Sequence, residues 1–462
     1  MAPRVRATSV PGLLVVDLDV HRDERGWFKE NWQRTRMVGL GLPDFGPVQH
    51  SVAHNGPAGV TRGIHAEPWD KLVSLVRGRA FGAWVDLREG PTFGAVHTEV
   101  LDEGTAVFVP RGVGNSYQTL IEDTVYSYLV NAHWSADAAY TMLDLADPTA
   151  AIPWPVPLSA ATVSAKDRDH PLLTDVSPVP PGRTLVLGAG GQLGRALLDA
   201  FPHAEGLTRE QLDLTDPDAI RALDLADVDT VLNAAAYTDV DGAQTPAGRQ
   251  TAWSVNATAV SRLAQAATEH GCTLVHYSSD YVFDGTRESS GEDDPPSPLG
   301  VYGQSKAAGD LAVAGVPRHY LLRTSWVVGE GRNFVSTMRD LARRGASPLV
   351  VDDQVGRLTF ASELARATGH LLHARPATGT YNVTGGGDPA SWADLAREVY
   401  RAEGADPDLV RPTTTGEYAR GADREVAPRP PRSVLRLDRI RAAGLDPEPQ
   451  LDALARHLHR TT

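Results

Sequence analysis

Residues 185–197 read LVLGAGGQLGRAL, in which an apolar run of strand character leads into a glycine-rich turn and then into a helical pattern. Gly188, Gly191 and Gly194 stand at this turn in the spacing GxxGxxG. Glycines at a strand-to-helix turn let backbone N–H groups and the helix N-terminus approach a pyrophosphate. The motif predicts a dinucleotide site, and it leaves open the alternative of a tight turn that binds nothing.

The segments downstream of this turn alternate between apolar strands and helical patterns. TVLNAAA (230–236) is followed by the helical run SVNATAVSRLAQAATEHG (254–271) and then by TLVHYSSD (273–280). Apolar strands that alternate with helices predict a parallel, doubly wound α/β sheet of the Rossmann class.

The segments upstream have a different texture. Short β-rich runs such as KLVSLVRG (71–78) alternate with turns rich in Gly, Pro and Asp, which predicts an antiparallel sandwich or barrel. A proline-rich stretch, TDVSPVPPGR (174–183), separates the two textures. We therefore expect an all-β domain over 1–175, a linker over 176–182 and an α/β domain over 183–462.

The composition limits the partners and the location of the protein. The chain of 462 residues has a formal net charge of −14, which argues against a nucleic acid or an anionic membrane as a partner. Its single cysteine, Cys272, excludes an intrachain disulfide. No stretch approaches the roughly 20 apolar residues that span a bilayer, and the N-terminus lacks the apolar core of a signal peptide. A cytoplasmic protein is expected.

The end of the second predicted strand bears on the choice of cofactor. The strand around AEGLT (204–208) is followed by Arg209, where an NAD-preferring site often has an acidic residue that binds the ribose 2′-hydroxyl. An arginine suits a 2′-phosphate, so NADPH is expected and NADH remains the alternative. A solvated surface arginine explains this residue equally well.

A second motif, YxxxK, places Tyr302 and Lys306 on one face of a helix. A nearby ammonium favours phenolate over phenol, so we expect Lys306 to lower the pKa of Tyr302. Tyr302 is then suited to pass a proton to a carbonyl oxygen while a hydride reaches the carbon. Ser279, at the end of the preceding strand, is expected to hydrogen-bond the same oxygen.

Further stretches carry a family resemblance over 183–462. They are NAAAYTDVD (233–241), SSDYVFDG (278–285), PLGVYGQSK (298–306), RTSWV (323–327), DDQVGRLT (352–359) and RPPRSVL (429–435). In this order they resemble the dTDP-4-dehydrorhamnose reductases, which are extended short-chain dehydrogenases. The resemblance implies Ser279, Tyr302 and Lys306 as the catalytic residues of an NAD(P)H-dependent ketone reduction.

The glycine turn and the resemblance together name the expected binding residues. Those along the cofactor are Gly188, Gly191, Gln192, Leu193, Gly194, Arg209, Asp213, Leu214, Ala234, Ala235, Tyr237 and Asn256. Those near the nucleotide sugar are Asp280, Tyr281, Arg323 and Trp326. A small substrate lobe is expected around YNVTGGGDPASWADLA (381–396). The resemblance leaves open whether Mg²⁺ takes part.

The upstream stretch TRGIHAEPWDK (61–71) contains a candidate base. A metal site in a β-barrel usually has an HxH pair, and the β-rich half has none, so no metal is expected. A neutral histidine such as His65 suits a proton next to a ketone, and Lys71 is suited to stabilise the resulting enolate oxygen. Tyr126 and Tyr128 are candidates for the acid on the opposite face. A hydrogen-bonded core histidine is the open alternative.

Several stretches extend a second resemblance over residues 10–173. They are DERGWFKE (23–30), GVTRGIH (59–65), KLVSLVRG (71–78), VDLREGPTFG (85–94), VPRG (109–112) and LSAATVSAKDRDHPLL (158–173). In this order they resemble the dTDP-4-dehydrorhamnose 3,5-epimerases, which are jelly-roll cupins without a metal. The resemblance implies His65 as the base, Asp167 as the residue that orients it, Lys71 for the enolate and Tyr128 as the acid.

The same resemblance places Arg25, Glu30 and Arg62 near the nucleotide sugar and implies a homodimer. Two positions depart from the family, because Asn115 stands where the family has a histidine and Trp134 where it has a second tyrosine. An asparagine side chain does not carry a titrating proton.

The leading hypothesis is a bifunctional enzyme of dTDP-L-rhamnose synthesis. It would epimerise dTDP-4-dehydro-6-deoxy-D-glucose at C3 and C5 and then reduce the 4-ketone of dTDP-4-dehydro-L-rhamnose with NAD(P)H. Two alternatives stay open: a reductase whose cupin domain only binds a nucleotide sugar or dimerises, and an enzyme of a related dTDP-deoxysugar pathway.

Overall fold

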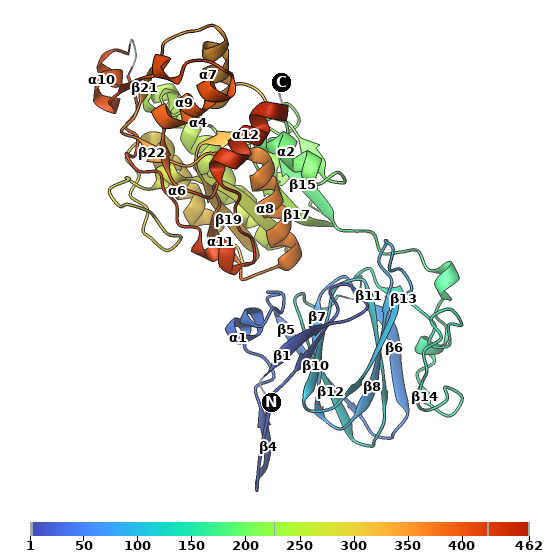
Figure 1. The fold of residues 1–462 in the computed structure, drawn as a ribbon. Helices are drawn as coiled ribbons and strands as arrows, with labels where there is room; N and C mark the ends of the chain where they lie inside the picture. Colours follow the sequence, from blue (N-terminus) through green and yellow to red (C-terminus); the bar gives the residue numbers. More distant parts are fainter. Residues whose placement is uncertain (1–2, 136, 226, 423–424, 461–462) are drawn as a thin grey trace. The chain divides into compact units, whose positions relative to one another are not determined.

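The computed structural model describes residues 3–135, 137–225, 227–422 and 425–460. Over these residues the chain divides into two compact units, the first ending at Pro181 and the second beginning at Gly182 (Figure 1). The expected two-domain architecture is confirmed.

Two sheets make up the N-terminal unit. The first has the order β1-β2-β10-β7-β12-β5, and the second has the order β13-β6-β11-β8-β9 with β14 beside β6. The strands of the first sheet are β1 (Arg4–Ala7), β2 (Leu14–Asp17), β10 (Thr105–Val109), β7 (Lys71–Arg77), β12 (Thr124–Val130) and β5 (Gln49–Asn55). Those of the second are β13 (Thr141–Met142), β6 (Val60–Ala66), β11 (Val113–Thr119), β8 (Ala80–Asp86), β9 (Val96–Leu101) and β14 (Thr162–Val163).

The two sheets enclose a common apolar core. Val73 and Val107 of the first sheet belong to one cluster with Trp84 and Tyr117 of the second, and all four are at most 4% exposed. Valine and aromatic side chains favour strands because they pack well on a pleated surface. The short β-rich runs of the sequence therefore form two sheets that share one apolar core.

The second sheet is also covered on its outer face. Every residue of β8 is buried, because Leu143, Leu145 and Trp154, from the segment that follows β12, pack with Ile64 and Val85 on that face. A strand buried on both faces is apolar throughout instead of alternating. The same covering segment carries β14, which pairs with β6.

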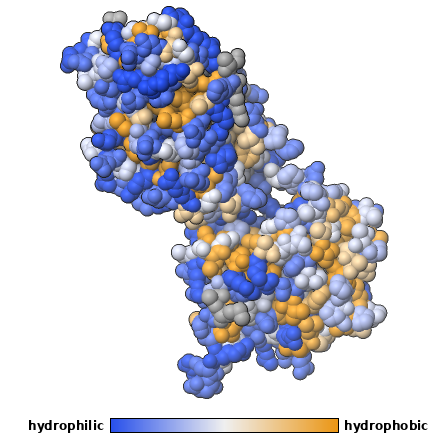
Figure 2. Space-filling model, viewed as in Figure 1, coloured by the Kyte–Doolittle hydropathy of each residue, from blue (hydrophilic) through white to orange (hydrophobic). Residues whose placement is uncertain are grey.

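A hairpin of β3 (Val20–Asp23) and β4 (Gly26–Lys29) projects from the N-terminal unit and precedes α1 (Arg34–Gly39) (Figure 1). Its turn is hydrophilic (Figure 2), whereas Phe28 is 69% exposed. An exposed strand pair leaves backbone N–H and C=O groups at its edges open to pairing with another strand.

Close backbone contact joins β6 and β11 at Gly63. This glycine has a φ of +110°, and a Cβ atom there would lie 2.6 Å from Asn115 O and 2.9 Å from Ser116 Cβ. Asn115 pairs with His65 across the two strands, and the register shifts between Asn115 and Tyr117. Glycine alone tolerates this φ together with so close a neighbour. The glycine therefore sets the path of the strand that carries His65.

A parallel sheet forms the centre of the C-terminal unit, in the order β16-β15-β17-β18-β19-β24. Its strands are β15 (Arg183–Leu187), β16 (Glu205–Leu207), β17 (Val228–Asn233), β18 (Thr273–Ser279), β19 (His319–Thr324) and β24 (Gly379–Asn382). The helices of this region are α2 (Gln192–Ala200), α3 (Pro217–Arg221), α4 (Pro246–Trp253), α5 (Ala259–His270), α6 (Val301–Val313), α8 (Ala361–Ala374) and α11 (Asp438–Ala442).

Alternate residues of each strand face opposite sides of this parallel sheet. Leu185 and Leu274 lie in one apolar cluster with Leu263 of α5, whereas Val186 lies in another with Leu364 of α8. Strands buried on both faces read as continuous apolar runs. Helices therefore cover both faces, as the alternation of strands and helices in the sequence predicted.

A smaller lobe is built from short elements of the C-terminal unit. They are β20 (Val327–Val328), α7 (Phe334–Arg343), β21 (Leu349–Val351), β22 (Val355–Gly356), β23 (Thr359–Phe360), β25 (Ala390–Ser391), α9 (Trp392–Ala402), β26 (Arg411–Thr413), α10 (Thr415–Arg420) and α12 (Gln450–Arg460). Its core includes Met338, Leu395 and Tyr400, all buried. The stretch 381–396, expected in a substrate lobe, contributes β25 and the start of α9.

Replacing Gly63 by alanine is expected to destabilise the N-terminal unit by about 1–3 kcal/mol, because the added Cβ atom is strained at this φ and meets Asn115 O. Calorimetry of the full chain measures the shift of the unfolding transition. Gly26→Ala in the hairpin is the matched control, since its φ of +132° is also positive and nothing lies within 4 Å of the added atom. Equal destabilisation by the two variants would contradict the close-contact explanation.

Candidate active sites

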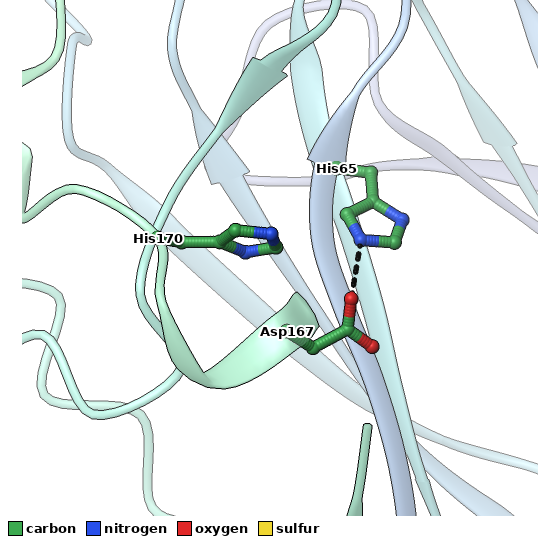
Figure 3. A group of neighbouring side chains, drawn as sticks. All are labelled: His65, Asp167 and His170. Atoms are coloured by element: carbon green, nitrogen blue, oxygen red, sulfur yellow. Dashed lines mark hydrogen bonds and ion pairs between the residues drawn. The ribbon is translucent and has the colours of Figure 1, made fainter. Parts of the chain in front are cut away.

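The first candidate site joins β6 to a short helical turn, η1 (Lys166–Arg168). His65 Nε2 lies 3.0 Å from Asp167 Oδ1 (Figure 3), and Asp167 N donates to Ser164 Oγ at 3.1 Å, which holds the turn. With Nε2–H donating to the carboxylate, the neutral ring keeps a free lone pair on Nδ1. Burial lowers the pKa of His65, and Asp167 opposes that shift. A ring that is neutral near pH 7 can accept a proton.

Lys71, on β7, is the cation of this site and is 5% exposed. Its Nζ atom forms an ion pair with Glu67 Oε2 at 2.5 Å and lies 5.6 Å from the centre of the Tyr128 ring. Burial lowers the pKa of Lys71, and the Glu67 carboxylate opposes that shift. The charge of Lys71 also helps to lower the pKa of His65. Lys71 therefore interacts with both His65 and Tyr128. Sequence reasoning missed Glu67, although it lies four residues before Lys71.

Asn115, which replaces the histidine of the family, has a structural role on β11. Its Oδ1 atom accepts hydrogen bonds from Trp84 Nε1 at 2.9 Å and from Tyr126 OH at 3.1 Å. Tyr126 is buried, and burial raises its pKa well above the usual range. Of the two candidate tyrosines, Tyr126 is therefore held inside the sheet, and the half-buried Tyr128 is the one beside Lys71.

The three residues expected near the sugar lie in different places. Arg62 lies on β6, the strand that carries His65, and its Nε donates to Asn55 Oδ1 at 3.0 Å. Arg25 lies in the hairpin turn, where it pairs with Asp23, and Glu30 pairs with Arg36 of α1 at 3.2 Å. The ion-pair partners of Arg25 and Glu30 thus lie in the hairpin and in α1. They do not lie on β6 or β7, the strands that carry His65 and Lys71.

The second candidate site begins at the glycine turn between β15 and α2. Gly188 has a φ of +78°, and a Cβ atom there would lie 2.7 Å from Ala235 N. A Cβ atom at Gly194 would lie 2.2 Å from Gly188 O. Close packing of the turn therefore requires glycine at both positions, whereas nothing lies within 4 Å of a Cβ atom at Gly190, and α2 begins directly after the turn at Gln192. Such a cradle, with a helix N-terminus behind it, suits a pyrophosphate.

The other expected cofactor residues follow the strand ends beside this turn. Arg209 is exposed after β16, and Asp213 Oδ1 accepts from Thr215 N at 2.9 Å in the next turn. Both ends of the Asn256 side-chain amide form hydrogen bonds within the chain: Oδ1 accepts from Tyr237 N at 2.9 Å, and Nδ2 donates to Tyr237 O at 3.0 Å. Asn256 therefore holds the loop after β17 in place. Of the remaining members of the set, Gly191 is exposed at the start of α2, Leu193 and Ala234 are half-buried, and Leu214 is buried.

Ser279, Tyr302 and Lys306 come together where β18 ends against α6. Burial raises the pKa of Tyr302 to about 12 and outweighs the opposing effect of the Ser279 hydroxyl. The expectation that Lys306 lowers this pKa was wrong, because burial raises it and the charges that act on the phenol, those of Asp280 and Asp310, raise it further. Tyr302 is therefore a phenol at neutral pH and still has a proton to donate.

Lys306 is anchored by groups that the sequence did not single out. Its Nζ atom donates to Tyr277 O at 2.6 Å and lies 3.3 Å from His276 Nε2. His276 Nδ1 lies 3.1 Å from Asn233 Nδ2, while Asn233 Oδ1 is buried without a hydrogen-bond partner among the described residues. A neutral imidazole has one N–H and one lone pair. Turning the Asn233 amide lets its Oδ1 accept from Nδ1–H and leaves Nε2 to accept from Lys306.

The charges of this network follow from burial. Burial lowers the pKa of His276 well below its usual value, so the ring is neutral. Burial also lowers the pKa of Lys306 to about 8, and the Asp310 carboxylate opposes that shift. A neutral acceptor beside a buried ammonium stabilises the charged form. The one hint in the sequence was a histidine inside an otherwise apolar strand.

Of the residues expected near the sugar, Arg323 is buried in an ion pair, and Tyr281 and Trp326 contact other aromatic rings. Arg323 is 5% exposed, and its Nε donates to Asp310 Oδ2 at 3.0 Å, so it is held inside the unit. The Tyr281 ring meets the Tyr302 ring edge-on at 5.7 Å. Trp326, with a φ of +47°, stacks on Trp392 of the small lobe at 3.7 Å.

Asp280 adds a carboxyl group directly behind Ser279. Ser279 Oγ donates to Asp280 Oδ1 at 3.0 Å, and Asp280 Oδ2 is buried without a hydrogen-bond partner among the described residues. Burial raises the pKa of Asp280 to about 6. An open carboxyl oxygen at this point is suited to a polar group of a ligand.

A glycine turn on a parallel sheet, followed by a serine–tyrosine–lysine set, defines the C-terminal unit as a reductase, and the N-terminal unit holds a histidine–aspartate pair of the epimerase type. The family model described as dTDP-4-dehydrorhamnose 3,5-epimerase matches residues 7–175, and the model described as RmlD substrate binding domain matches residues 182–462. The chain belongs to both families, one through each unit.

Individual relatives agree with these matches. Protein RmlC homolog of Streptococcus pyogenes is 48% identical over 179 residues, which are 37% of this chain and 90% of that protein. The dTDP-4-dehydrorhamnose reductase of Mycolicibacterium smegmatis is 40% identical over 294 residues, which are 61% of this chain and 87% of that protein. A crystal structure of the Bacillus anthracis reductase in complex with NADP is 30% identical, with a TM-score of 0.56, and covers 61% of this chain and 99% of that one.

Among the described residues, no helix is both long enough and apolar enough to cross a bilayer.

Replacing Asn115 by alanine is expected to lower the free energy of unfolding of the N-terminal unit by about 1–3 kcal/mol, because the Trp84 and Tyr126 donors lose their shared acceptor. Urea unfolding followed by tryptophan fluorescence measures the loss. Gln49→Ala is the control, since the half-buried Gln49 side chain accepts from the backbone N–H of the exposed Trp134 at 3.0 Å and donates to Ser51 Oγ at 3.2 Å, and its loss stays within about 0.5 kcal/mol. A neutral Asn115→Ala would contradict the structural role.

Proposed function

We propose that this chain catalyses two consecutive steps of dTDP-L-rhamnose synthesis. The N-terminal unit epimerises dTDP-4-dehydro-6-deoxy-D-glucose at C3 and C5, and the C-terminal unit reduces the 4-ketone of the product with NADPH. The observation that carries the proposal is that one chain holds the His65–Asp167 pair at 3.0 Å in one unit and Tyr302 beside Ser279 in the other.

We assign the domain boundaries accordingly. The proposed epimerase domain covers 1–175 and is a jelly-roll cupin, the linker covers 176–182, and the reductase domain covers 183–462 and is a Rossmann fold with a small substrate lobe. The strand orders of the two antiparallel sheets and of the parallel sheet support these assignments.

In the epimerase step, His65 acts as the base. Its Nδ1 lone pair takes a proton from a carbon next to the ketone, the C–H electrons form the enolate, and Asp167 balances the charge of the imidazolium. Lys71 stabilises the enolate oxygen. Tyr128 then gives its proton to the opposite face of the same carbon, which inverts the centre. Loss of one proton and gain of another leave the composition of the sugar unchanged.

In the reductase step, Tyr302 acts as the acid. NADPH supplies the hydride that the ketone carbon receives. Tyr302 gives its proton to the ketone oxygen, and Ser279 donates a hydrogen bond to the same oxygen. Lys306, held by His276 and the Tyr277 carbonyl, stabilises the phenolate that remains until solvent returns a proton.

The residues of the glycine turn would hold the cofactor. The turn is open at Gly190, where nothing lies within 4 Å of a Cβ atom, and it leads into the N-terminus of α2, which suits the pyrophosphate. Arg209 is exposed at the end of β16, where it suits a 2′-phosphate, so NADPH is the proposed cofactor. The NADP in the B. anthracis relative supports this choice.

We further propose which residues meet the sugar nucleotides. Asp280, Tyr281 and Trp326 would contact the substrate of the reductase, while Arg323 supports the site from its buried pair with Asp310. Arg62 would contact the substrate of the epimerase within one chain. Arg25 and Glu30 belong to the region of the projecting hairpin, and its exposed Phe28 supports a homodimer in which such residues serve the partner.

The alternative of a non-catalytic cupin domain rests on Asn115, which replaces a family histidine and is occupied by Trp84 and Tyr126. A single NMR experiment separates it from the main proposal. The full chain in D₂O, without NADPH, should place deuterium at C3 and C5 of dTDP-4-dehydro-6-deoxy-D-glucose. Absence of exchange above the blank would favour the alternative, and exchange at one carbon would indicate a related deoxysugar pathway.

Replacing His65 by alanine is expected to reduce this exchange by about 10²-fold or more, because the base is removed. The same variant should reduce supplied dTDP-4-dehydro-L-rhamnose at the wild-type rate, which shows that the chain is folded and the reductase intact. Exchange at the wild-type rate would remove His65 from the mechanism.

Replacing Tyr302 by phenylalanine is expected to lower NADPH oxidation with dTDP-4-dehydro-L-rhamnose by about 10²–10⁴-fold, because the proposed proton donor is removed. Absorbance of the reduced cofactor measures the rate. Tyr320→Phe is the control, since Tyr320 lies on β19 and its hydroxyl donates to Pro376 O. A similar loss in both variants would point to misfolding instead of chemistry.

The rate of reduction is expected to fall as the pH rises through about 8, because Lys306, whose pKa lies near 8, acts in its cationic form below that value. His276→Leu removes the neutral acceptor and should move this limb of the kcat profile to lower pH. Tyr277→Phe is the control, since it removes only the hydroxyl bound to Thr368 and keeps the carbonyl that Lys306 uses. An unchanged limb in His276→Leu would show that the histidine does not set it.

A further inference from the structure

His170 lies close to the epimerase pair without any role in the proposed mechanism. It follows Asp167 by three residues, and its ring meets the His65 ring edge-on, with 5.6 Å between centroids. Both of its ring nitrogens are buried, and neither has a hydrogen-bond partner among the described residues. Native proteins rarely bury an imidazole nitrogen unpaired, because its hydration is lost without replacement. Two such nitrogens on one ring indicate that a ligand belongs there.

The neighbours of His170 are of the kind that bind a metal ion. One nitrogen from each of His65 and His170 and one carboxylate oxygen of Asp167 all lie within 4.8 Å of one another. Figure 3 shows the three side chains around a common point, with His170 opposite the His65–Asp167 hydrogen bond. In a tetrahedral zinc site the ligand atoms lie about 2.0–2.2 Å from the ion, so two of them are roughly 3.3–3.6 Å apart. His65 Nε2 and Asp167 Oδ1, at 3.0 Å, are already close to that separation, and a movement of the His170 ring by about 1 Å closes the set.

We propose that His65, Asp167 and His170 form a binding site for a divalent transition-metal ion of the zinc class, and that the bound ion switches the epimerase off. Two imidazoles and a carboxylate are a ligand set that zinc uses with a fourth position left open. Calcium and magnesium prefer oxygen ligands and do not fit a set with two nitrogens. Imidazole suits zinc, cobalt and nickel.

Metal binding and catalysis exclude each other at His65. In the metal-free chain Nε2–H donates to Asp167, and Nδ1 has the free lone pair. An ion that shares the Asp167 oxygen takes the lone pair of Nε2, so the single proton of the neutral ring moves to Nδ1. Neither nitrogen then accepts a proton from the sugar. The inhibitory part of this inference rests on the proposed epimerase function, whereas the binding site does not.

Cobalt is the probe for binding, because Co²⁺ takes zinc sites and its d–d absorption reports on the ligands. The full chain, stripped with a chelator, is titrated with Co²⁺ and then with Zn²⁺. We expect a visible band from the wild type that Zn²⁺ displaces. His170→Phe should lose the band and bind Zn²⁺ at least ten-fold more weakly by calorimetry. His54→Phe is the matched control, since His54 is an exposed histidine of the same unit that pairs with Asp123.

The second readout is inhibition. Zn²⁺ at concentrations that saturate the site should stop deuterium exchange by the wild type, leave exchange by His170→Phe running, and leave ketone reduction by both unchanged. His170→Gln serves if the phenylalanine variant fails to fold. It keeps a polar side chain but removes the imidazole, and it should also lose the cobalt band.

Each contrary result has a clear reading. Equal cobalt binding by wild type and both His170 variants, or equal inhibition of all of them by Zn²⁺, would overturn the site. A wild-type cobalt band without any epimerase activity would keep the metal site and contradict the proposed function. Loss of the band in His54→Phe as well would show that surface histidines bind the ion.

Discussion

Burial of a lysine ammonium is the constraint around which both candidate sites are built. Lys71 and Lys306 are at most 5% exposed, and burial lowers the pKa of each. A cation removed from water needs close acceptors. Glu67 supplies a carboxylate to Lys71, and Lys306 has the Tyr277 carbonyl and a neutral imidazole. Each lysine is thereby fixed in place, and burial makes its ammonium easier to deprotonate than an exposed one.

The same loss of hydration decides the state of the acids and bases around these lysines. It lowers the pKa of His65, so the ring is free to accept a proton, and it raises the pKa of Tyr302, so the phenol keeps its own. The two shifts have opposite signs for one reason: burial disfavours whichever form is charged. A base for an epimerisation and an acid for a reduction follow from placing two different groups in similar surroundings.

Asn115 shows how a departure from a family can be absorbed without loss of the fold. Its amide oxygen accepts from Trp84 and Tyr126, and it pairs across the strands with His65. Asn115 therefore helps to hold β6, the strand that carries His65, in place, although its side chain does not relay protons. The hydrogen bond between His65 and Asp167 forms without any contribution from Asn115.

Much of the fold could be predicted from the sequence because its signals are local. The glycine turn at 188–194 and the alternating strand patterns need only neighbouring residues for their meaning. The motif residues His65 and Tyr302 were also readable, since short stretches around them resemble known families. Strand order, by contrast, depends on which segments meet, and a single sequence does not record that.

Sequence by itself determined the two-unit plan, the apolar strands and the candidate site residues, because periodicity, turn residues and short motifs act within a few positions of each other. Tertiary structure alone decided the partners: Glu67 for Lys71, His276 for Lys306, and His170 beside His65. It also decided the sign of the pKa shift of Tyr302. The physical reason is that burial and hydrogen bonding depend on distances through space, which only the folded chain defines.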